Sequence, residues 1–90
     1  MSVDLYADPW AEGGRTQAYL GRVSHELLAG TELSMNAWME RLLSGLREAA
    51  SRRGANAVVD VRITLDPFAD RGTRMTISGQ AQLVSMLQAS

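Results

Sequence analysis

The sequence predicts an α+β fold of the β-α-β-β type, in which one helix packs on an antiparallel sheet. Two observations predict it. Apolar residues recur with helical spacing between Ser34 and Arg53. Residues 16–28, 57–65 and 73–83 instead alternate with the period of two that is typical of strands. A glycine at the end of the helical segment marks the point where one period gives way to the other.

The expected helix carries one apolar stripe at i, i+3, i+4 and i+7 spacing. Ser34 or Thr31 can cap its first free N–H groups, and Gly54 can adopt the left-handed conformation that ends it. The stripe consists of Met35, Trp38, Met39, Leu42, Leu43, Leu46, Ala49 and Ala50.

The first expected strand covers Thr16–Leu28, before the helix. Strict alternation places Tyr19, Gly21, Val23, His25 and Leu27 on one face and Ala18, Leu20, Arg22, Ser24 and Glu26 on the other. A glycine inside a strand is typical of a bulge or a close backbone approach, which we expect at Gly21.

The second and third expected strands, Ala57–Leu65 and Thr73–Leu83, are joined by the turn-rich residues 66–72. Alternation in the second strand places Ala57, Val59, Val61, Ile63 and Leu65 on the face that packs against the helix. The opposite face of the sheet is predicted to be polar, with Arg22, Asp60, Arg62, Thr64, Arg74, Thr76, Ser78, Gln80 and Gln82.

The chain is expected to form one domain over residues 1–90. Residues 1–13 are expected to be extended, with a short strand possible at Leu5–Ala7, although Pro9 argues against a central strand. Paired glycines make residues 11–15 a turn rather than a phosphate-binding loop, since no Lys-Ser/Thr follows them. Residues 84–90 either continue the third strand or form a frayed tail.

Composition excludes several classes of function. A net charge of -1 gives no electrostatic footprint for nucleic acid or an acidic membrane surface. The absence of cysteine excludes a disulfide framework, a thiolate metal site and a thiol nucleophile. Without an apolar run long enough to span a bilayer, or a secretory signal, the expected location is the cytoplasm.

The expected sheet also favours association with further copies of the chain. Its polar face holds fewer charges than a solvated surface normally does, which suits a lumen or a wet subunit interface. Long regular edge strands invite pairing, and the third strand carries neither Pro nor Lys to block it. Sheets joined across subunits in a ring would remove those edges. The alternative is a monomer whose polar face is exposed to solvent.

Four segments resemble the YbjQ-like (UPF0145) family of small bacterial proteins, which are described as heavy-metal-binding domains. The segments are Tyr19–Ser24, Leu46–Ala50, Arg53–Arg62, which contains Gly-Ala-Asn-Ala-Val-Val, and Met75–Ala81 with its Gly-x-Ala. They occur in the family's order and cover about residues 12–84. The resemblance implies a dodecin-like β-α-β-β subunit and a pentameric ring.

Three residues are the candidates for a divalent metal site: His25, Glu26 and Asp60. Imidazole and carboxylate ligands suit zinc, nickel or copper, and copies in a ring could bring them together on an axis. The alternative for His25 is a partly buried side chain at an interface, because alternation places it with Val23 and Leu27. For Asp60 it is ion pairing with Arg62 or Arg74 between subunits, or a place in a solvated lumen.

Two tryptophans bear on a second kind of ligand. Trp38 belongs to the helical stripe and is expected in the core, whereas Trp10 lies outside regular elements beside Pro9. Dodecin-like assemblies bind flavin by aromatic stacking, so Trp10 is the candidate for a planar ligand. No nucleophile and base stand at motif spacing, so no catalysis is expected. The sequence therefore predicts a homo-oligomeric binding or scaffold protein, with a flavin-storing assembly as the alternative.

Overall fold

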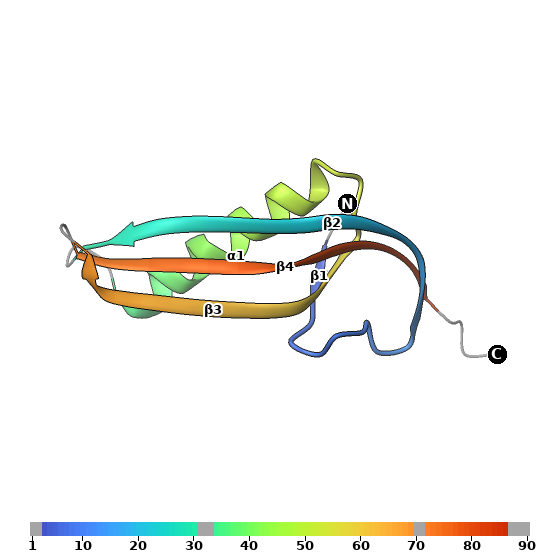
Figure 1. The fold of residues 1–90 in the computed structure, drawn as a ribbon, viewed down its shortest axis with the longest axis horizontal. Helices are drawn as coiled ribbons and strands as arrows, with labels where there is room; N and C mark the ends of the chain where they lie inside the picture. The colour runs from blue at the N-terminus through green and yellow to red at the C-terminus, as the bar shows by residue number, and fades with distance from the viewer. Residues whose placement is uncertain (1–2, 31–33, 70–71, 87–90) are drawn as a thin grey trace.

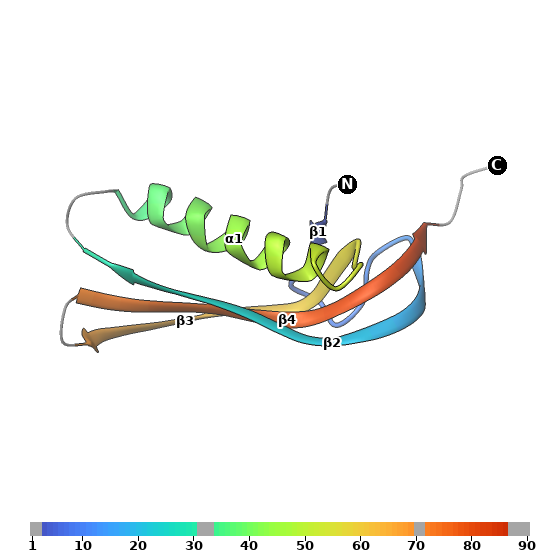
Figure 2. The ribbon, with the colours of Figure 1, turned by 90° about the horizontal axis from the view of Figure 1, so that it is seen from above.

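A computed structural model describes residues 3–30, 34–69 and 72–86. Its elements are β1 (Asp4–Leu5), β2 (Gly14–Ala29), α1 (Met35–Ser51), β3 (Ala57–Ala69) and β4 (Gly72–Met86). The four strands form one sheet in the order β1-β3-β4-β2, and α1 lies across one face of it (Figures 1 and 2). The prediction of an α+β fold with one helix on a sheet is confirmed. None of the described helices is long and apolar enough to cross a membrane.

The sheet is mixed rather than wholly antiparallel. β4 pairs antiparallel with both β2 and β3, so the third predicted strand is central and the expectation that it forms an open edge is wrong. β1 runs parallel to β3 at its edge. Asp4 pairs with Ala57 and Leu5 with Val58, and the Tyr6 amide donates to the Val58 carbonyl at 2.9 Å. The expectation of an antiparallel sheet is therefore wrong at this edge, because the N-terminal segment lies beside β3 and runs in the same direction.

Both ends of α1 follow the local sequence. The Ser34 hydroxyl accepts a hydrogen bond from the Ala37 amide at 3.2 Å, so Ser34 caps the helix; Thr31 lies outside the described residues. At the other end Gly54 has φ +79°, and the Ala55 amide donates to the Ala50 carbonyl at 3.1 Å. The chain then turns directly into β3.

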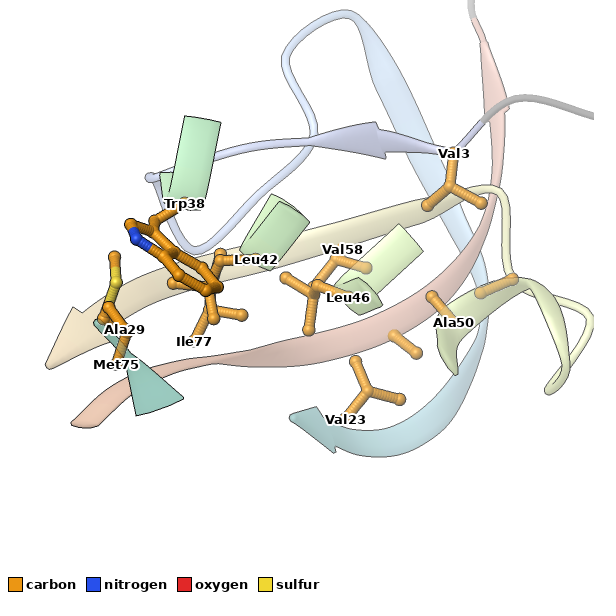
Figure 3. Close-up of a cluster of buried hydrophobic side chains, with 12 residues drawn as sticks. Val3, Val23, Ala29, Trp38, Leu42, Leu46, Ala50, Val58, Met75 and Ile77 are labelled. Carbon is orange, nitrogen blue, oxygen red and sulfur yellow. The ribbon is translucent and has the colours of Figure 1, made fainter. Parts of the chain in front are cut away.

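The predicted stripe of α1 forms the main core (Figure 3). Trp38, Leu42, Leu46 and Ala50 are buried against the sheet, whereas Met35 in the first turn stays about half exposed. The sheet side of this core consists of Val23 and Ala29 from β2, Val58 from β3, and Met75, Ile77 and Ala81 from β4. Figure 3 shows the Trp38 ring lying against Met75 and Ile77 near the start of the helix.

A bulge at Asp60 divides β3 into two halves of opposite alternation. Asp60 has φ +53°, and the pairing with β4 shifts between Val59 and Arg62. Val58 and Val61 therefore pack toward the helix, while Val59 packs on the opposite face. The prediction that Ala57 and Val59 share a face with the later apolar residues is wrong, since the extra residue reverses the alternation.

A second bulge, at Gly21 in β2, confirms the expectation for that glycine. Gly21 has φ +91°, and the pairing with β4 shifts between Tyr19 and Arg22. Leu20 consequently packs with Val23 on the helix side, so the predicted alternation across Gly21 is wrong. The Arg53 guanidinium donates to the Leu20 carbonyl at 3.0 Å and fills the space where a Gly21 side chain would stand.

The N-terminal segment covers part of the face that was predicted to be polar. Ala11 is buried there with Ala57, Val59 and Val84. Gln82 is buried on this face too, and its side-chain oxygen accepts a hydrogen bond from the Thr16 hydroxyl at 2.9 Å. This end of the face is thus a small second core, which strand alternation alone did not predict.

Asn56 joins the end of α1 to β4. Its side-chain amide donates to the Val84 carbonyl at 2.7 Å, and its side-chain oxygen accepts from the Val84 amide at 2.8 Å. The side chain therefore makes the two bonds that a neighbouring strand would make. This pairing gives a physical reason for asparagine in the Gly-Ala-Asn-Ala-Val-Val segment.

We predict that Asn56→Ala lowers the free energy of unfolding by about 1–3 kcal/mol, because it leaves two partly buried backbone groups of Val84 without partners. Asn36→Ala is the matched control, since Asn36 is exposed on α1 and alanine favours a helix. Urea denaturation at one fixed protein concentration measures both. Equal effects of the two substitutions would contradict the role assigned to Asn56.

Candidate functional site

A hollow of about 500 Å³ lies between β2 and the adjacent side of α1. The hollow is open to solvent. One wall consists of the side chains of β2 that face the helix, and the other is one side of α1. From β2 come His25 and Leu27, and from α1 come Ala37, Glu40, Arg41, Ser44, Gly45 and Glu48.

His25 lies at the floor of this hollow, directly against Gly45. A Cβ atom at Gly45 would lie only 2.2–2.4 Å from the Cδ2, Nε2 and Cγ atoms of the imidazole. Glycine inside a helix is about 1 kcal/mol less favourable than alanine. Its presence here lets the imidazole lie flat against the helix backbone. The placement of His25 on the face of Val23 and Leu27 is confirmed.

Two of the charged groups that line the hollow, those of Glu48 and Arg41, interact with other residues of the helix. Glu48 forms an ion pair with Arg52 at 2.6 Å, and the Arg41 guanidinium lies 5.3 Å from the centroid of the Trp38 ring. The described residues show no hydrogen bond from His25 to Glu40 or Ser44. The hollow can thus contact a ligand through an imidazole, carboxylates and a hydroxyl.

A single chain does not bring the three predicted metal ligands together. His25 faces α1, whereas Glu26 faces the other way and pairs with Arg74 at 3.3 Å. Asp60 lies in the β3 bulge and pairs with Arg62 at 3.3 Å. Within residues 3–30, 34–69 and 72–86, no group of three or more His, Asp or Glu side chains could hold a metal ion. Metal binding between copies of the chain stays a prediction.

Two ion pairs join charged residues of the sheet within the chain. Arg62 with Asp60 and Arg74 with Glu26 are both largely exposed pairs. Such pairs contribute at most about 1 kcal/mol each. Their geometry fits the ion-pairing interpretation given for Asp60, here within one chain rather than between subunits.

The two tryptophans differ as expected. Trp38 is 7% exposed and belongs to the core, and its indole N–H is buried without an acceptor in the described part of the chain. Trp10 is 60% exposed and lies outside the helix and the strands. Whether Trp10 stacks on a planar ligand such as flavin stays a prediction.

Sequence reasoning identified His25 but missed the helix flank that faces it. The signal that could have revealed this flank is Gly45, since a glycine in the middle of a predicted helix usually has a packing reason. The register between β2 and α1 that joins His25 to Gly45 is a tertiary feature, which periodicity does not contain.

Comparison with known proteins supports the fold and leaves the function open. No family model and no curated protein sequence matches the chain. A crystal structure of a protein of unknown function from Pediococcus pentosaceus, assigned to the DUF74 family, is similar in fold. The TM-score is 0.52 at 8% sequence identity, and the match covers 93% of this chain and 97% of that one. Similarity at this identity concerns the fold alone.

We predict that Gly45→Ala destabilises the protein by about 1–3 kcal/mol, because the added methyl group overlaps the imidazole of His25. In a His25→Ala background the same substitution should be neutral or stabilising by up to about 1 kcal/mol. A double-mutant cycle in urea at constant protein concentration measures this change of sign. Stabilisation of equal size in both backgrounds would contradict the packing described.

Proposed function

We propose that the chain is a homo-oligomeric, ring-forming binding or scaffold protein of the YbjQ-like type, with a dodecin-like subunit in a pentamer and no catalytic role. The observation that carries the proposal is the size of the sheet relative to the helix that covers it. The family resemblance supplies the number five, and the fold supplies the reason for association.

The strands are unusually long for so small a chain. β2, β3 and β4 contain 16, 13 and 15 residues, against a usual length of about 3–10 residues. A 15-residue strand spans about 50 Å at about 3.3 Å per residue. The 17-residue helix spans only about 25 Å. One helix therefore covers about half the length of the sheet, as Figure 2 shows.

The sheet also exposes apolar side chains that the chain itself does not cover. Ile63, Leu65 and Leu83 are 42%, 48% and 41% exposed, and Tyr19 and Leu28 are exposed as well. Association would bury surface of this kind.

Two other functions are each supported by a single observation. Flavin storage has the exposed Trp10 in its favour, and an absorption spectrum of the purified protein tests it. Divalent metal binding has His25 in an open hollow in its favour. Calorimetric titration of the wild type and of His25→Ala with zinc and copper tests metal binding. The absence of binding heat in both proteins would exclude it.

We predict that light scattering coupled to size exclusion gives the mass of an oligomer. Five copies of the 9.8 kDa chain amount to about 49 kDa. The reason is the exposed apolar surface and the unpaired strand edges, which association removes. A single species of 9.8 kDa at micromolar concentration would overturn the proposal, and a closed oligomer of another number would overturn only the pentamer.

A further inference from the structure

The sheet has two unpaired edges in the described part of the chain. β2 forms one edge along its length, since β4 is the only described strand that pairs with it. On the other side, β1 pairs with β3 only at Ala57 and Val58, and the amides of Asp60 and Val61 bond to the N-terminal segment. From Arg62 to Leu65 none of the other described strands lies beside the outer side of β3.

These two edges lie at the same position along the strand direction, because the same residues of β4 pair with both β2 and β3. Arg22–Ala29 of β2 pairs with β4 without interruption, and so does Arg62–Asp66 of β3. The shared pairs are Ser78 with Ser24 and Arg62, Ile77 with His25 and Ile63, Thr76 with Glu26 and Thr64, Met75 with Leu27 and Leu65, and Arg74 with Leu28 and Asp66.

The directions of the strands match as well. β2 and β3 are both antiparallel to β4 and are therefore parallel to each other (Figure 1). A second copy, rotated about an axis roughly along the strands, places its β3 beside β2 in the same direction. The two edges then form a parallel ladder with little or no sliding.

The side chains on the helix side fit this arrangement. Ile63 and Leu65 share the face of Ile77 and Met75, yet α1 leaves both partly exposed. On the β2 side the hollow beside His25 and Leu27 lies where the helix-facing side chains of an added strand would point. One edge thus presents apolar side chains, and the other presents a space of about 500 Å³.

We propose that the Arg22–Ala29 edge of β2 in one copy pairs in parallel with the Arg62–Leu65 edge of β3 in the next copy, with Ile63 and Leu65 entering the hollow between β2 and α1. This inference rests on the proposed function and specifies which surfaces meet. A two-fold β2–β2 pairing would leave the β3 edge and both apolar side chains exposed. The head-to-tail pairing uses both edges, and it gives the ring of the proposed function when the rotation between copies closes.

Engineered disulfides test the pairing directly, because the chain has no cysteine of its own. Arg62→Cys is combined in turn with Arg22→Cys, Ser24→Cys and Glu26→Cys, which allows a stagger of two residues in either direction. Within one chain β4 separates the two cysteines by two strand spacings, about 10 Å. That separation is too long for a disulfide, whereas neighbouring strands of two copies lie about 5 Å apart.

After oxidation, at least one double variant should form a ladder of covalent oligomers, and the single variants should stay as protomers. Covalent dimers from a single β2 cysteine would overturn the inference in favour of the two-fold pairing. An oligomer by light scattering without cross-links in any double variant would also overturn it while leaving the proposed function intact. A protomer-sized wild type would overturn both.

A pair of matched substitutions tests the apolar contact. Leu65→Arg should shift the mass toward the protomer, since a charge would then enter the hollow. Leu83→Arg is the control, because Leu83 is similarly exposed but belongs to the central strand, away from both proposed edges. An unchanged mass for Leu65→Arg, or an equal loss of mass for both variants, would overturn the inference.

Discussion

The structure depends on β4, the only described strand that is paired along both of its sides. Its backbone fixes the direction of β2 and β3 and their register relative to each other. Along Arg22–Ala29 of β2 and Arg62–Leu65 of β3, none of the other described strands pairs with the outer side, so strands of other chains can add there. The long strands of this small chain therefore form its core but also leave strand edges exposed.

The helix limits how much of this sheet one chain can cover. α1 buries Trp38, Leu42, Leu46 and Ala50, and Gly45 brings its backbone against His25. The flank toward β3 keeps Met39 and Leu43 only partly buried, and beyond it Ile63 and Leu65 remain exposed. Burial is thus complete along the middle of the sheet and incomplete at both sides, which is the pattern that favours association over a self-contained monomer.

Much of the fold could be predicted from the sequence, because the signals were local. The cap at Ser34, the stop at Gly54 and the stripe from Trp38 to Ala50 all depend on residues a few positions apart. The bulge at Gly21 was also predicted, since glycine inside a strand is a local signal. These features need no knowledge of tertiary contacts.

The remaining features depend on partners that are distant in sequence. The carbonyls of Asp8 and Tyr6 accept hydrogen bonds from the amides of Asp60 and Val61 and so stabilise the bulge in β3. Because the bulge reverses the alternation, Ala57 and Val59 lie on the face opposite to the predicted one. The parallel strand β1 and the burial of Gln82 have the same origin in the N-terminal segment. For the site, His25 was a candidate from the sequence, but its separation from Glu26 and Asp60 and its contact with Gly45 follow from the tertiary register.

The central claim is that β2 and β3 obtain their missing backbone partners from other copies of the chain. Residue-resolved hydrogen exchange measures this most directly, because it reports on the outward amides of both strands that do not donate to β4. The account predicts slow exchange for these amides in Arg22–Ala29 and Arg62–Leu65, comparable to that of the amides of β4. Fast exchange along both edges, beside slow exchange within β4, would contradict it.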